Sequence, residues 1–219
     1  MFQIHHYVTA TGVDLFARWL EELADRQTRA RIKTRIDRAS LGNFGDVEPV
    51  GEAVAELRID WGPVIACISP APAGPFCFCS AVATRGHSEG ISKMPKRISK
   101  TISAGRKKPV PASVPHELWL IERLKDPEEA AAYLEAAIED GDQGALMLAL
   151  RHIAQARGGV AAIARKSKLT REATYRMLSK SGNPELRSLT AILGAAGLRL
   201  SVKPIEQRPT RPVIEEVLP

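Results

Sequence analysis

The sequence predicts an α+β protein in three zones: an α+β amino-terminal part, a linker and an all-α carboxyl-terminal domain. Residues 1–62 combine a helical apolar period with strand-like alternation, whereas residues 116–204 show helical periods separated by capping residues. Residues 63–115 follow neither period and are rich in proline, glycine and cations, so we expect this linker to be disordered. Residues 205–219 form a tail. The 219 residues, 44% of them hydrophobic, suffice to fill a core.

An alternating stretch and two helices open the amino-terminal part. Residues 2–5 alternate and predict an edge strand. A first helix is predicted by apolar side chains at i, i+3, i+4 and i+7, which are Phe16, Trp19, Leu20 and Leu23. A second is predicted over residues 27–41, with Ile32 and Ile36 inward. Its outer face carries five cations, which are Arg29, Arg31, Lys33, Arg35 and Arg38. The four arginines would contact RNA phosphates or, as charged helix faces more often do, simply meet solvent.

A hairpin supplies the remaining predicted strands of this part. Residues 46–50 and 54–59 form its two arms, and Gly51 lies in the turn. Helices that pack on only two or three strands leave an incomplete core. We therefore expect the amino-terminal part to be unstable or molten alone.

The composition of the linker excludes several classes of protein. Residues 62–84 lack charged side chains, but four prolines among them would break a membrane-spanning helix. Cys67, Cys77 and Cys79 are too few for a four-ligand zinc site and odd in number for a disulfide framework. Seven cations and no acid lie between residues 90 and 116, so the net charge of +6 says little about partners. The first residues lack the pattern of a secretory signal, and we expect a cytoplasmic protein without membrane contact.

The carboxyl-terminal domain is predicted to be helical apart from one terminal strand. Asp126 and Pro127 provide an N-cap and a first helical residue, and Glu129 places a carboxylate in the first turn. Gly141 ends this helix, and Asp142 caps the next. Helices are expected at residues 116–124, 127–140, 143–156, 160–167, 170–179 and 184–196, and a strand at 199–203.

Residues 160–179 have the layout of a helix-turn-helix. This motif needs a small residue where its helices cross and an apolar seam, so that the second helix enters a major groove rigidly, and Ala164, Leu169 and Leu178 meet this need. Lys168 departs from it, because glycine is usual in the left-handed turn, and Thr174 stands where an apolar residue is preferred. The predicted DNA-binding residues are Thr170, Arg171, Glu172, Tyr175, Arg176 and Lys180. The alternative is an ordinary helical domain with a basic surface.

Four short segments of this domain point to one family. They are W-L-I-E-R-L-K-D-P-E-E-A at residues 119–130, Tyr133-Leu134, Y-R-M-L-S at residues 175–179 and Gly182-Asn183-Pro184. Together they resemble the HigA-like helix-turn-helix antitoxins of addiction modules, over residues 94–204. Such antitoxins bind a cognate toxin and repress their own operon. The resemblance therefore implies a toxin partner and operator DNA, and a homodimer is expected on a palindromic site.

The amino-terminal part contains a second set of such segments. They lie at residues 16–36, G-N-F-G-D at residues 42–46, and residues 50–63. They resemble the start of HigB or RelE/ParE-like toxins, whose RelE/HigB-type members cut mRNA on the ribosome, but the resemblance ends at Pro63. Codons that permit residues 64–69 also permit the family's next strand in a frame shifted by one base. We hypothesise that one lost base fused a truncated toxin to the antitoxin, which the nucleotide sequence around Pro63 tests.

These observations predict an antitoxin-type DNA-binding transcriptional regulator of a type II toxin-antitoxin module, with an inactive toxin remnant and no enzyme activity. The alternative is a ribosome-dependent mRNA endoribonuclease toxin held silent by its fused antitoxin. A third possibility is that toxin binding survives and DNA contact is lost. No nucleotide, metal or cofactor motif is found, and neither His116 nor His152 has a catalytic partner nearby in the sequence.

Overall fold

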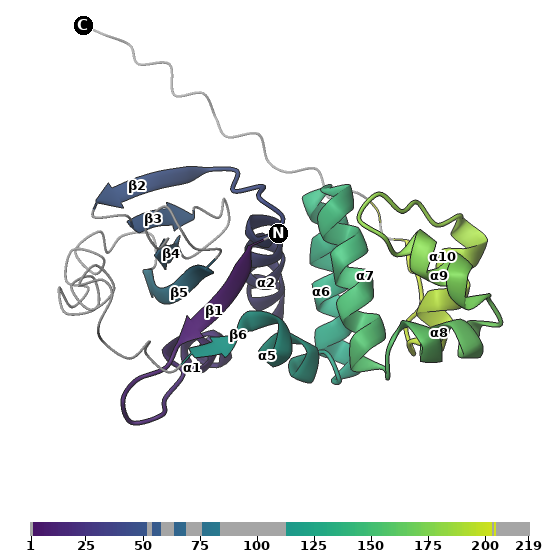
Figure 1. Cartoon of the computed structure of the whole chain (residues 1–219), viewed down its shortest axis with the longest axis horizontal. Coiled ribbons are helices and arrows are strands. Elements are labelled where there is room, and N and C mark those ends of the chain that lie inside the picture. Colours follow the sequence, from purple (N-terminus) through teal and green to yellow (C-terminus); the bar gives the residue numbers. More distant parts are fainter. Residues whose placement is uncertain are drawn as a thin grey trace, which may run out of the picture.

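A computed structural model of the chain describes residues 2–51, 54–57, 64–68, 76–83, 113–202 and 204. These residues form a β-sheet with two helices packed against it and, beside them, a bundle of six helices (Figure 1). Helix α2 (Arg26–Ser40) lies between the sheet and helix α6 (Pro127–Asp140) of the bundle. The amino-terminal part and the carboxyl-terminal domain therefore meet along α2.

The described strands form one six-stranded sheet in the order β2-β3-β4-β5-β1-β6. The strands are β1 (Gln3–Tyr7), β2 (Val47–Gly51), β3 (Val54–Leu57), β4 (Val64–Ile68), β5 (Phe76–Ala83) and β6 (Ser113–Pro115). Neighbouring strands are antiparallel, except that β1 and β5 are parallel. The predicted hairpin is confirmed as β2 and β3. The prediction that β1 is an edge strand is wrong, because β5 and β6 flank it.

Three of these strands come from residues 63–115, where we predicted a disordered linker and no strand. That prediction is wrong for β4, β5 and β6. No proline interrupts β4 or β5, because Pro63 precedes β4 and Pro70, Pro72 and Pro75 fall between the two strands in the sequence. The sheet is thus larger than the two or three strands expected. The rest of the predicted linker, residues 63, 69–75 and 84–112, lies outside the described residues, as does the tail, residues 205–219.

Helices α1 (Leu15–Glu22) and α2 form as their sequence pattern predicts. Each begins at an aspartate: the Asp14 carboxylate accepts from the Ala17 N–H at 2.9 Å, and Asp25 caps α2. Their apolar faces meet the sheet in a core that contains Ile4, Phe16, Leu20, Ile32, Ile36 and Leu57. This core sets the position of α2.

The carboxyl-terminal domain contains all six predicted helices in its described residues. Besides α6, they are α5 (His116–Arg123), α7 (Gln143–Ala156), α8 (Val160–Ser167), α9 (Arg171–Met177) and α10 (Leu186–Ala195). Asp126 and Asp142 cap α6 and α7 as predicted, and Gly141 ends α6 with φ 74°. The predicted strand at 199–203 is wrong for residues 199–202, which have no strand beside them, and Lys203 lies outside the described residues. None of the described helices combines the length and apolar character that a bilayer crossing requires.

Candidate nucleic-acid interface

A tight turn joins α8 to α9. Helix α8 ends at Lys168, whose φ of 58° and ψ of 29° are left-handed. The Leu169 N–H donates to the Ala164 carbonyl at 3.0 Å, a bond that commonly closes a helix of this ending. The turn therefore forms with lysine at the position that favours glycine.

The seam between the two helices is buried and polar groups within it are satisfied. Ala164 and Leu178 are buried and Leu169 is half-buried against the same core, as predicted. Thr174 is fully buried, and its hydroxyl donates to the Thr170 carbonyl at 2.9 Å. Threonine is accommodated at the seam because its hydroxyl finds this partner within the helix. The Thr170 hydroxyl in turn accepts from the Ala173 N–H at 3.2 Å and caps α9.

All six predicted DNA-binding residues are exposed to solvent: Thr170, Arg171, Glu172, Tyr175, Arg176 and Lys180. The Arg171 guanidinium lies over the Tyr175 ring, 5.5 Å from its centroid, so that a cation and an aromatic face are presented together. Within the described part of the chain, Arg171, Arg176 and Lys180 form no ion pair with a carboxylate. These cations are free to meet an external anion.

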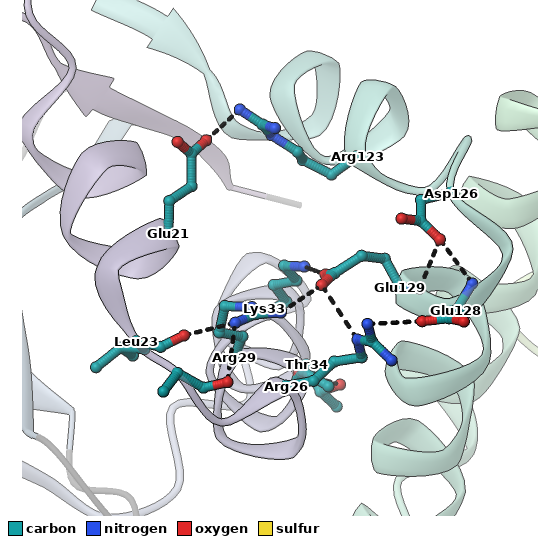
Figure 2. A network of polar contacts seen from close by, with 12 residues as sticks. Glu21, Leu23, Arg26, Arg29, Lys33, Thr34, Arg123, Asp126, Glu128 and Glu129 are labelled. Atoms are coloured by element: carbon teal, nitrogen blue, oxygen red, sulfur yellow. Dashed lines mark hydrogen bonds and ion pairs between the residues drawn. The ribbon is translucent and has the colours of Figure 1, made fainter.

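The cations of α2, which we predicted to lie on its outer face, mostly pair with acidic side chains of α6 instead. Figure 2 shows this for Arg29 and Lys33, which meet Glu129. Arg29 pairs with Glu129 at 2.7 Å, Arg31 with Glu139 at 3.1 Å and Arg38 with Asp140 at 2.7 Å. Arg35 is buried and donates to the carbonyls of Phe44 and Asp46. The prediction failed because helical periodicity identifies the polar face of α2 but not the acidic helix that covers it.

Lys33 is the most buried cation of this contact. Its side chain is 3% exposed, and its ammonium lies 2.5 Å from a Glu129 carboxylate oxygen. Burial lowers the pKa of Lys33, although Glu129 opposes that shift. Burial would raise the pKa of Glu129, but hydrogen bonds from Lys33 and Arg29 outweigh it and the pKa is lowered. Both groups are thus held as a charged, hydrogen-bonded pair between the two parts of the chain.

His116 and His152, which have no catalytic partner nearby in the sequence, have hydrogen-bonding partners in the fold. His6 of β1 lies 2.8 Å from Asp14 through Nδ1 and 2.8 Å from His116 Nδ1 through Nε2. If His6 donates its Nδ1 proton to Asp14, its Nε2 accepts from His116, and the buried His116 Nε2 is left without a partner in the described residues. His152 lies 3.0 Å from the Tyr133 hydroxyl, which donates to Asp37 of α2.

Both clusters join the amino-terminal part to the carboxyl-terminal domain. A cavity of about 380 Å³ lies beside them and is lined by residues that include His5, Asp37, His116, Glu117 and His152. Among the described residues, no group of three or more histidine, cysteine, aspartate or glutamate side chains is arranged to hold a metal ion. Sequence reasoning missed the contact between His6 and His116 because more than one hundred residues separate them.

Comparison with known proteins identifies the family of the carboxyl-terminal domain. The family described as "Probable addiction module antidote protein" matches residues 116–204. Two Haemophilus influenzae proteins, both described as "Uncharacterized protein", are similar to the chain. One is 45% identical over 47 residues, which are 22% of this chain and 48% of that protein. The other is 32% identical over 82 residues, which are 37% of this chain and 84% of that protein.

The chain thus spans about half the length of the first of these relatives and most of the second. Similarity to uncharacterized proteins extends to the amino-terminal part of the chain. No solved structure matches the chain. Because the second relative is 32% identical over 84% of its length, the chain belongs to the same family as that protein, and its residues 116–204 are an addiction-module antidote domain.

Proposed function

We propose that this chain is an antidote-type transcriptional regulator, not an enzyme, which binds operator DNA through a helix-turn-helix formed by α8 and α9. The observation that carries the proposal is the exposed surface of α9, where Arg171, Tyr175 and Arg176 face solvent without a carboxylate partner in the described residues. Guanidinium groups of this kind contact guanine edges and phosphates. The antidote domain in which they lie supports the same assignment.

The protein partner implied by the antidote family is a cognate toxin, and the regulator would act on DNA in the cytoplasm. As a homodimer it would place two copies of α9 about 34 Å apart, one helical turn of a palindromic operator. The amino-terminal part, which resembles the start of HigB or RelE/ParE-like toxins, is proposed to be an inactive remnant.

Binding of the purified chain to the DNA upstream of its own gene tests the proposal. We expect Arg171→Ala and Arg176→Ala each to weaken binding by about tenfold, because each removes a base or phosphate contact. Where the lost contact is to a phosphate, the slope of log affinity against log salt should fall by about 0.9. Arg18→Ala is the matched control, since Arg18 is an exposed arginine of α1 whose ion pair is with Glu22. Affinity unchanged in both α9 variants would remove these residues from the interface.

Two structural observations favour a second candidate, a ribosome-dependent mRNA endoribonuclease held silent by its fused antitoxin. The sheet continues past Pro63 into β4 and β5, and α6 covers cations of α2 that would otherwise be open to RNA. Expression of residues 1–115 without the antidote domain separates the two functions. Growth arrest with mRNA cleavage would favour the endoribonuclease, whereas no phenotype would favour the remnant.

A further inference from the structure

Helix α6 packs against other helices through two of its faces, and the two faces serve different purposes. One face contributes Ala130, Tyr133, Leu134 and Ala137 to the core of the antidote domain, and that core cluster contains no residue of α2. The other face repeats at helical spacing and meets α2; it consists of Glu128, Glu129, Ala132, Ala136, Glu139 and Asp140, and we call it the acid face of α6. The domain core therefore closes without α2, and the acid face is a surface added to it.

The acid face matches α2 in both shape and charge. At its centre, Ala132 and Ala136 are buried against Ala30 of α2, and such small side chains let two helices approach closely. Around this centre, six ion pairs join the two helices within the described residues. An apolar centre with a polar rim is the usual anatomy of an interface between separate proteins.

The buried polar groups make this contact selective. Suppose that a helix without a cation at the position of Lys33 replaced α2 on the acid face. Glu129 would then lose its hydrogen bond from Lys33, and Lys33 would lose Glu129. The Tyr133 hydroxyl likewise donates to Asp37 from within the contact. A suitable occupant is thus a basic amphipathic helix with a small residue at its centre.

We propose that the acid face of α6 is the partner-binding surface of the antidote domain, that it accepts such a basic helix from a toxin-like protein, and that α2 fills it in cis. This proposal rests on the proposed function, because it names how the antidote domain takes its partner. While α2 is docked, the chain is closed to a second toxin-like chain. A second copy of this chain is the probe, because it shows whether the acid face of one chain binds α2 of another.

Two full-length variants with complementary charges test the proposal. The first carries Arg26→Glu and Arg31→Glu, so that its α2 no longer fits its own acid face. The second carries Glu128→Lys and Glu139→Lys, so that its altered α6 no longer fits its own α2. All four side chains are at least one-third exposed, so the substitutions leave the two cores intact.

Mixed together, each variant offers the other the helix that fits. With one variant affinity-tagged, we expect the mixed pair to be captured about tenfold more than wild type with wild type, because the wild-type acid face is already filled in cis by α2. The mixed pair should exceed either variant with itself by a similar factor, because like charges face each other in those self-pairs. All four substitutions in one chain should restore the contact in cis. Each double variant should lower Tm by about 2–4 °C, and the fourfold variant should recover that loss. Arg18→Glu with Glu22→Lys, an exposed pair on α1, is the control.

Each result decides the proposal. Recovery of Tm without capture of the mixed pair would show a contact that works only in cis, and would overturn it. Absence of recovery would overturn the acid face itself. DNA binding is read separately: loss of the proposed function would appear as DNA binding insensitive to Arg171→Ala and Arg176→Ala, whatever the capture experiment shows.

Discussion

Lys168 holds a left-handed backbone conformation in the turn between α8 and α9, and it is the one non-glycine residue with positive φ in the described part of the chain. This conformation brings Cβ close to the following carbonyl in every residue except glycine. The turn still forms, because the seam on either side is buried and the Leu169 N–H is bonded. The packing of α8 against α9 thus compensates for the strain of the left-handed conformation at Lys168.

Replacing Lys168 with glycine should raise the free energy of unfolding of the antidote domain by about 1 kcal/mol, because the strain is removed. Chemical denaturation followed by circular dichroism measures it. Gly141→Ala is the matched control: Gly141 ends α6 with φ 74° and open space around it, so alanine should lower stability by a similar amount. Equal stability of Lys168→Gly and wild type would show that the turn carries no strain.

The pair formed by Lys33 and Glu129 provides a second prediction. Glu129→Gln should lower the free energy of unfolding by about 3 kcal/mol, because it leaves the buried Lys33 ammonium without its carboxylate. Adding Lys33→Met should recover most of this loss, since no uncompensated charge then remains. A double variant no more stable than Glu129→Gln would mean that the cost lies in the other partners of Glu129, chiefly Arg29.

The helices of this chain could be predicted from the sequence because their signals are local. Asp126 and Asp142 cap α6 and α7 at the positions where their side chains reach the next N–H groups, and Gly141 ends α6. The exposure of Arg171 and Arg176 follows from the same helical period. These features need only a few neighbouring residues.

The strands and the contact between α2 and α6 could not be predicted in the same way. A strand depends on its neighbour, and β1 finds its neighbours in β5 and β6, far along the chain. Proline and glycine around β4 and β5 obscured their short apolar runs. For α2, the sequence shows a polar face, but whether water or an acidic helix covers it is decided by the tertiary fold. The hydrogen bond between His6 and His116 could not be predicted either, because the two residues lie far apart in the sequence.

At the scale of the whole molecule, the two parts of the chain are joined by groups that respond to acid. Burial, followed by the nearby His6, His152 and Lys33, keeps the pKa of His116 well below its usual range. The pKa of Asp14, raised by burial but lowered more by its bonds to His6 and the α1 N-terminus, is below its ordinary value, as is that of Glu129. His116 thus stays neutral in the fold where the unfolded chain would be protonated.

The free energy of unfolding should therefore fall in two steps as pH falls. Below about pH 6.5 the unfolded chain binds a proton at His116 that the folded chain does not, which costs up to about 1.4 kcal/mol per pH unit. The carboxylates Asp14 and Glu129, with lowered pKa in the fold, stabilise it above about pH 4.5, and this contribution is lost below that pH.

Two histidine variants test this profile. His116→Asn keeps a polar atom facing His6 but cannot titrate, so it should flatten the first step and leave the second. His5→Asn should change the first step less, because the pKa of His5 is lowered by burial and by His6 but not as far. Denaturation curves between about pH 2 and pH 8 measure both steps. A His116→Asn curve parallel to wild type near pH 6 would assign the first step to another group.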